Sequence, residues 1–260
     1  GKRASTGDPR GTLLFRFIQW VWHMRPSWFI FENVRGLVSA SLRHRPIKDR
    51  PDNGGSPLEP DERPGSVLDA VLHELPSEYR IDAYLLNSAD YGVPQLRERV
   101  FFIGNCLGMA VDRPATTHGT PEVPHRTLRD AIWHLRDDPG DYLDYSVRQK
   151  GVLADVPPGG NWRSLTPERQ EATMGGAFAA GGGKTGWWRR LSWDRPAPTI
   201  LTQPNHSSTS LCHPDQTRPL SLSECAAIQQ FPAGYPFHGT LHQRYTQVGN
   251  AVPVGMAEAV

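Results

Sequence analysis

The stretch Trp28-Phe29-Ile30-Phe31-Glu32-Asn33-Val34 decides the fold expected for this chain. Its first four residues are apolar and three of them are aromatic, which is typical of a short strand with both faces buried. The run then ends in a carboxylate and an amide. Because ligands of open α/β sheets bind beyond the carboxyl ends of the strands, Glu32 is a candidate for contact with a substrate. The structural alternative is that Glu32 caps a turn or pairs with a nearby arginine.

The composition is that of a loop-rich globular protein. The 260 residues are 38% hydrophobic, which is enough for a core, and the 25 glycines and 24 prolines indicate many loops. A net charge of +1 does not point to nucleic acid, so nucleic-acid binding would have to come from local arginine clusters. Cys106, Cys212 and Cys225 form no C-x-x-C pair. We therefore expect no metal site and no disulfide framework, and a location in the cytoplasm. The sequence has no signal peptide and no run of 18 apolar residues, so we expect no membrane span.

Helical and strand patterns alternate along the first hundred residues. Apolar spacing predicts helices over 12–25 and 67–75, and short alternating or apolar runs predict strands over 29–31, 79–86 and 100–104. A helix that leads directly into a buried strand is the repeating unit of a parallel α/β sheet. Residues 41–65 are charged and rich in proline and glycine, so we expect a surface loop. Its basic start could touch phosphate or be simply solvated.

A pair of arginines precedes the last of these strands in Gln95-Leu96-Arg97-Glu98-Arg99. On an extended backbone, the period of two places Arg97 and Arg99 on one face. Two adjacent guanidinium groups suit a bound anion or a carbonyl oxygen. The alternative is a structural network of salt bridges.

The composition changes after Cys106, where short apolar runs alternate with glycine-rich turns as far as residue 217. One helix is expected over 126–135. Arg189, Arg190 and Arg195 stand among tryptophans and could contact phosphates and base edges. The alternative is an irregular β-rich domain with tryptophan in a small core. The glycine run at 181–183 lacks the spacing of a phosphate-binding P-loop.

The last forty residues are more regular. Ser221-Leu222-Ser223-Glu224 has the pattern of a capping box that opens a helix over 222–231. Residues 247–253 are expected to form a tight loop, whose small residues either let a ligand approach the backbone or make a simple turn. The chain starts inside a polar loop and stops within an apolar pattern, so we expect a fragment of a longer protein or one subunit of a split protein.

Taken in order, these segments resemble the DNA cytosine-5 methyltransferases. The resemblance is carried by Phe31–Val34, Gln95–Arg99, Arg218–Glu224 with 229–232, and Gly249–Pro253, with a variable region between the second and third. The opening residues 1–11 resemble the loop that follows the family's Pro-Cys motif. Each motif is weak alone, whereas their common order along nearly the whole chain is specific.

The resemblance implies an α/β fold: part of a Rossmann-like, S-adenosylmethionine-dependent methyltransferase domain with a smaller, irregular β-rich target-recognition domain. It divides the chain into catalytic residues 1–105, target recognition over 106–217, and a return to the catalytic domain over 218–260. The implied partner is double-stranded DNA. Arg189, Arg190 and Arg195 are the candidates for contact with it. A bacterial restriction-modification enzyme near the nucleoid would fit.

The family methylates C5 of cytosine after a cysteine thiolate adds to C6, on a base flipped out of the duplex. By resemblance, Glu32 holds the N3 edge of the base, Arg99 holds its O2 and Arg97 supports Arg99. Asn250 and Val252 would line the site of S-adenosylmethionine. Hydrogen bonding at N3 would ease the attack on C6 as charge develops there.

Two family features are absent from the sequence: the Pro-Cys nucleophile and the glycine-rich segment that binds the methyl donor. None of the three cysteines has the context of the nucleophile, which should precede Gly1. We therefore expect this piece alone to be inactive and to need a missing N-terminal segment or partner subunit. The alternatives are a tRNA cytosine-5 methyltransferase and a non-catalytic DNA-binding subunit. The length of the variable region favours DNA over tRNA.

Overall fold

The computed structural model describes residues 9–179 and 185–260, with side chains described from residue 13 onward. The loop expected at the start of the chain and the glycine run at 181–183 therefore lie wholly or mostly outside the described residues. The chain forms two compact units: Gly1–Leu86 with Glu98–Arg113, and Asn87–Arg97 with Pro114–Val260. Within the described ranges, no helix is long and apolar enough to span a membrane.

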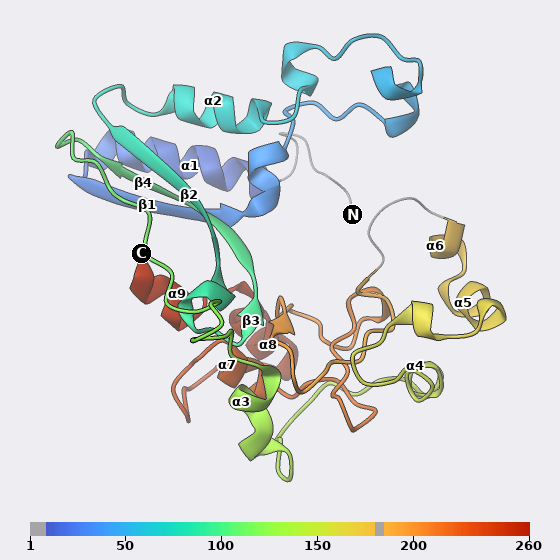
Figure 1. Cartoon of the computed structure of the whole chain (residues 1–260). Helices are drawn as coiled ribbons and strands as arrows, with labels where there is room; N and C mark the ends of the chain where they lie inside the picture. The colour runs from blue at the N-terminus through green and yellow to red at the C-terminus, as the bar shows by residue number, and fades with distance from the viewer. Residues whose placement is uncertain (1–8, 180–184) are drawn as a thin grey trace. The chain divides into compact units, whose positions relative to one another are not determined.

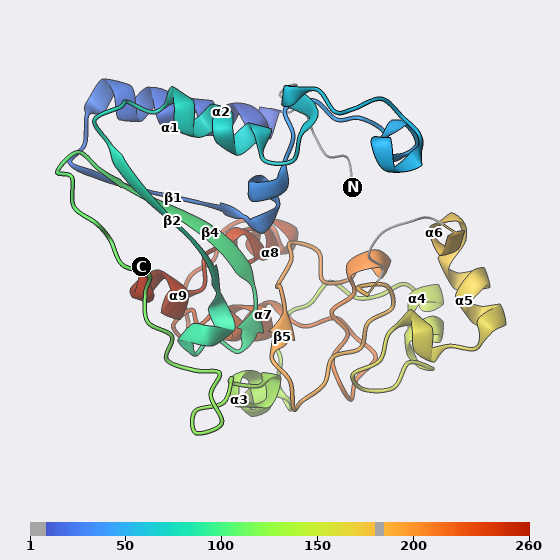
Figure 2. The same ribbon diagram turned by 45° about the horizontal axis from the view of Figure 1, so that its top comes forward.

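The first unit contains a sheet with the strand order β1-β4-β2. Its elements are α1 (Pro9–Met24), β1 (Trp28–Val34), α2 (Ser66–Glu74), β2 (Arg80–Asn87) and β4 (Glu98–Asn105), and α1 and α2 cover the same face of the sheet (Figures 1 and 2). All the predicted strands are present, but β1 and β4 are antiparallel. The parallel arrangement that we predicted is wrong for this pair, because apolar patterning reports burial and carries no information on strand direction.

The core of the first unit lies between the sheet and its two helices. Leu14, Ile18 and Val21 of α1 pack with strand residues such as Phe29 and Phe102. The prediction that β1 is buried on both faces is wrong. Its other face carries Trp28, Ile30 and Val34, which are 41%, 53% and 51% exposed. An aromatic run alone cannot distinguish a central strand from the edge strand that β1 forms among the described residues.

The predicted surface loop over 41–65 is ordered by its own charges. Glu62 is buried and pairs with Arg45, which also donates to the Ser56 carbonyl oxygen at 2.7 Å. Arg43 pairs with Asp61 at 3.0 Å. The basic start of the loop is thus partly neutralised within the loop itself.

The second unit is built from short elements around two hydrophobic clusters. The helices and strands of this unit are β3 (Gln95–Leu96), α3 (Leu128–Ile132), α4 (Val147–Leu153), α5 (Pro167–Met174), α6 (Gly176–Ala179), β5 (Ala197–Pro198), α7 (Leu222–Ile228), α8 (Leu241–Asn250) and α9 (Val254–Ala259). β3 and β5 pair in parallel. The region expected to be β-rich is irregular as predicted, but its described regular structure is mainly short helices. Trp162, Trp188 and Trp193 are buried and contribute to the two cores.

The capping box predicted for α7 is confirmed. The Ser221 hydroxyl accepts from the Glu224 amide at 3.0 Å, and the Glu224 carboxylate accepts from the Ser221 amide at 2.7 Å. The tight loop predicted over 247–253 is wrong at its start, because α8 continues to Asn250. A helix can contain Gly249 when tertiary packing outweighs its low helix propensity.

Candidate functional site

Glu32 and Arg99 form an ion pair on adjacent strands of the first unit. Glu32 lies opposite Phe101 and Val34 lies opposite Arg99, so the antiparallel register brings Glu32 and Arg99 into a diagonal position on one face. Arg99 Nε contacts Glu32 Oε1 at 2.8 Å, and the side chains are 12% and 28% exposed. Burial lowers the pKa of Arg99, while the neighbouring Glu32 opposes that shift. Both charges are therefore held together in a partly desolvated position.

This pair lies on the face of β1 that also carries its exposed apolar side chains. Trp28, Ile30, Glu32 and Val34 alternate with the inward-facing Phe29 and Phe31, as the period of two requires. Glu32 lies inside the strand and not beyond its end, because β1 continues to Val34. The predicted acid is thus beside an apolar surface that could receive a flat ring.

Arg97 belongs to the second compact unit and is only 2% exposed. Its guanidinium donates to the carbonyl oxygens of Ile200 and Gly249, each at 3.1 Å. Arg97 therefore fastens three distant segments of the sequence to one another. The predicted role of Arg97 was to support Arg99, and these contacts hold backbone instead of the Arg99 side chain, so that role stays a prediction.

Two buried glutamines extend this connection. Gln95 accepts from the Ile200 amide at 2.8 Å and donates to the side-chain oxygen of Gln229 at 3.1 Å. Gln229 donates in turn to the Val248 carbonyl oxygen at 2.8 Å, and both glutamines are fully buried. Both glutamines belong to motifs quoted in the sequence analysis. Nothing in the sequence indicated that they contact each other, because they are 134 residues apart.

The glycine before the predicted donor-lining residues is packed against protein backbone. A Cβ at position 249 would lie 2.7 Å from both the Leu201 carbonyl carbon and the Thr202 nitrogen. A ligand approaching the backbone was one of two alternatives for these small residues, and at Gly249 the close approach is made by the chain itself. Asn250 is exposed at the end of α8 and Val252 is half-buried in the link to α9, so both side chains remain partly accessible.

The Arg218–Glu224 motif forms a buried ion pair with two hydrogen bonds of 2.8 Å. His213 lies beside it and is 1% exposed. His213 Nδ1 accepts from the amides of Asp215 and Gln216 at 3.2 and 3.1 Å, which places its proton on Nε2. Burial lowers the pKa of His213 to about 4, with Glu224 opposing the shift. This cluster connects the start of α7 to the preceding chain.

The three arginines predicted to contact DNA have different environments. Arg190 is buried and donates to the carbonyl oxygens of Val156, Leu153 and His213, among others. It therefore holds the surrounding turns together. Arg189 is half-buried and donates to the Ser210 carbonyl oxygen at 3.1 Å, whereas Arg195 is exposed. DNA contact stays a prediction for all three, and Arg195 is the most accessible.

The cysteines and acids do not assemble into a reactive or metal-binding group within the described ranges. Cys212 and Cys225 are buried, and desolvation raises the pKa of Cys212 to about 11 and that of Cys225 well above its usual value. Neither forms a thiolate readily at neutral pH. Cys106 is exposed and lies 3.8 Å from the Ser27 carbonyl oxygen. No cluster of three or more potential metal ligands is found among these residues.

Similar sequences are found among Type II methyltransferases. The chain is 35% identical to the Type II methyltransferase M.Sau96I of Staphylococcus aureus over 100% of its own length and 55% of that protein. It is 36% identical to the Type II methyltransferase M.Eco47II of Escherichia coli, again over 100% of this chain and 58% of the relative. The chain thus spans somewhat more than half the length of these curated relatives.

The fold has a counterpart among solved structures. A candidate DNA modification methyltransferase encoded within an Escherichia coli prophage matches with a TM-score of 0.58 and 20% identity, over 97% of this chain and 72% of that chain. The sequence profile of the family described as C-5 cytosine-specific DNA methylase matches residues 1–260. The chain therefore belongs to the C-5 cytosine-specific DNA methylase family.

Proposed function

We propose that this chain holds the target base in a DNA cytosine-5 methyltransferase, which methylates C5 of a flipped cytosine in a specific duplex sequence. The observation that carries the proposal is the Glu32–Arg99 pair, at 2.8 Å on a partly exposed face. A glutamate side chain can accept from the N4 amino group of cytosine and, when protonated, donate to its N3, and a guanidinium donates to its O2. The two side chains together supply both kinds of group within the reach of one pyrimidine.

We propose that Asn250 and Val252, in the second compact unit, contact the methyl donor. S-adenosylmethionine would supply the methyl group, and an exposed amide beside a half-buried apolar side chain suits a ligand with polar and apolar parts. Arg97, Gln95 and Gln229 would keep this end of α8 in place through the buried bonds described above. Their role is to orient, because their polar groups are occupied by backbone and by one another.

We propose further that the nucleophilic thiolate comes from outside these 260 residues. Buried Cys212 and Cys225 are poor thiolates, and Cys106 lacks the sequence context of the family's nucleophile. β1 is an edge strand in the described sheet, and its exposed side chains leave an apolar face open. On α1, Leu13, Trp20 and Met24 are 67%, 61% and 66% exposed. A missing N-terminal segment or partner subunit would cover these surfaces.

Residues 106–217 are proposed to read the DNA sequence within a bacterial restriction-modification system. The names of the curated relatives, which are Type II methyltransferases, support this assignment. The substrate would then lie in the cytoplasm at the nucleoid.

The test is to express the chain together with an N-terminal complement taken from a relative and to map 5-methylcytosine in host DNA by bisulfite sequencing. We expect methylation at one sequence motif only when both parts are present. In vitro, duplex DNA and tRNA are offered with labelled donor at matched salt, because phosphate contacts make affinity depend on salt. Methylation of tRNA alone would replace the DNA assignment, and sequence-specific DNA binding without methylation would favour a non-catalytic subunit.

A further inference from the structure

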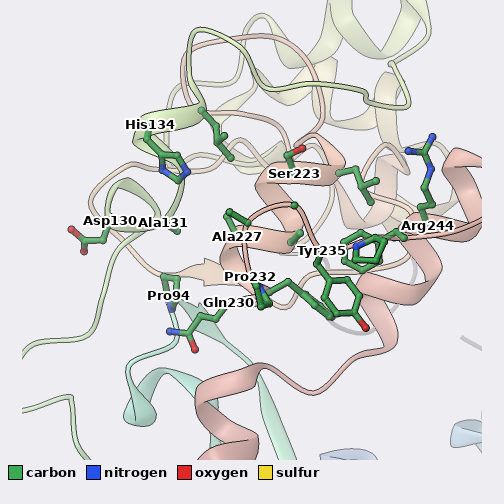
Figure 3. A pocket seen from close by; sticks show the side chains of 18 of the residues that line it. Pro94, Asp130, Ala131, His134, Ser223, Ala227, Gln230, Pro232, Tyr235 and Arg244 are labelled. Carbon is green, nitrogen blue, oxygen red and sulfur yellow. The ribbon is translucent and has the colours of Figure 1, made fainter.

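The second compact unit contains a cavity of about 680 Å³ that the proposed methyl transfer does not use (Figure 3). Its floor is the outer face of α7, where Ser223, Ala226 and Ala227 are small. Residues of α3 form one wall and the segment after α7 forms the other. A cavity of this size falls within the range of small-molecule sites in proteins.

The second wall is aromatic. Phe231, Tyr235 and Phe237 form a cluster in which each pair of ring centroids is 5.0 Å apart. Tyr235 is 49% exposed, and its side chain is among those that line the cavity (Figure 3). Exposed rings in a concave site favour a ligand that carries a planar ring, because offset and edge-to-face contacts add to the burial of apolar area.

The charged groups of the cavity favour an anion. Arg126 and Arg244 both line it. Arg244 Nε is buried and has no hydrogen-bond partner among the described residues, and its ion pair with Asp141 is long, at 3.8 Å. A buried donor without an acceptor is costly unless something else supplies one.

Among the described residues that line the cavity, the one carboxylate, Asp130, is already engaged. Asp130 accepts from the Thr127 amide at 2.7 Å and from the Thr127 hydroxyl at 2.9 Å. The backbone bond from Thr127 is the main reason why the pKa of Asp130 is lowered. The negative charge of Asp130 thus offsets one guanidinium group. The second guanidinium group gives the cavity an excess of positive charge.

We propose that this cavity binds a small anion built on a planar aromatic ring, with the ring against Tyr235 and the anionic group at Arg244. A nucleoside monophosphate and an aromatic carboxylate share this chemistry. The inference goes beyond the proposed methyl transfer and does not depend on it, because it is tested by binding to the chain alone.

Isothermal titration calorimetry with two matched pairs of probes tests the proposal: AMP against adenosine, and indole-3-acetate against indole-3-acetamide. We expect at least one anion to bind roughly tenfold or more tightly than its neutral partner, since a hydrogen bond to a charged group is worth about 1.5–3 kcal/mol. The probe that binds identifies the anionic group. Arg244→Gln and Arg126→Gln should reduce the preference for the anion. Arg129→Gln, on the same helix as Asp130 but outside the cavity lining, should not.

Four outcomes would overturn the proposal. The first is equal binding of charged and neutral probes, and the second is no saturable binding of either anion at millimolar concentration. The third is an equal loss of the preference for the anion on Arg129→Gln, which would indicate non-specific attraction. The fourth is a loss of AMP binding on Asn250→Ala with Arg244→Gln unaffected, which would place the ligand in the methyl-donor site instead. In two-dimensional NMR spectra, chemical-shift changes on ligand addition that are confined to residues 126–135 and 223–237 would support the proposal. Chemical-shift changes elsewhere would count against the proposal.

Discussion

Replacing Gly249 with alanine should destabilise the second unit, although the same change usually stabilises a helix. Gly249 lies in α8 with a negative φ, so alanine would gain roughly 1 kcal/mol of helix propensity. Its new Cβ would lie 2.7 Å from the Leu201 carbonyl carbon and the Thr202 nitrogen. Overpacking of this kind costs typically about 1–3 kcal/mol.

The upper part of that range applies here because the opposing atoms are backbone atoms that cannot easily move. Residue 200, directly before them, is held by the bonds from its amide to Gln95 and from its carbonyl oxygen to Arg97. Any displacement would strain these buried bonds. We therefore expect a net loss of about 2 kcal/mol from the opposing effects of packing and propensity.

Gly151 provides the matched control. It lies in α4 of the same unit, and a Cβ there would meet nothing within 4 Å. Gly151→Ala should raise the free energy of unfolding by up to roughly 1 kcal/mol. Urea denaturation, followed by tryptophan fluorescence, measures both variants on the same transition. If Gly249→Ala were as stable as Gly151→Ala, the close approach at residues 201–202 would not govern this position.

Three further outcomes are expected. Stability should fall by about 3 kcal/mol as pH drops from about 6.5 to about 4, because the unfolded chain protonates His213 in this window and the folded chain does not. His213→Asn, which can still accept from the amides of Asp215 and Gln216, should show a flatter slope in urea titrations at each pH. In the methyltransferase assembled with the proposed N-terminal complement, Glu32→Gln should slow single-turnover methyl transfer by roughly 100-fold or more while DNA affinity stays nearly constant; equal losses in both would contradict its role. The 260-residue chain alone should incorporate no labelled methyl group into DNA, and incorporation above background would show that it contains its own nucleophile.

Much of the local structure follows from the sequence. The apolar spacing in 12–25 and 67–75 identified α1 and α2, and the Ser221–Glu224 pattern identified the start of α7. These predictions succeed because amphipathic periodicity and capping depend on residues within one or two turns. Glu32 and Arg99 were also found as candidates, since an acid that ends an apolar run and an R-x-R pattern that precedes another apolar run are both visible locally.

The partners of these residues could not be predicted in the same way. Sequence spacing suggested that Arg97 and Arg99 share a face, yet Arg97 binds backbone at residues 200 and 249 while Arg99 pairs with Glu32. Arg190 is a candidate for DNA contact from its sequence, and the structure adds that it is buried among carbonyl oxygens. An arginine next to tryptophan has the same local pattern in both settings, because burial depends on chain segments that are distant in sequence.

The sequence by itself determined the family, the α/β alternation and the candidate base-holding pair, because these depend on residue types in a fixed order. Only the tertiary structure decided which groups meet. It set β1 antiparallel to β4, so that Glu32 lies diagonal to Arg99, and it joined Gln95 to Gln229 across 134 residues. It also formed the cavity between α3 and the aromatic segment after α7. Register, burial and concavity arise from contacts between distant segments, and no local pattern encodes those contacts.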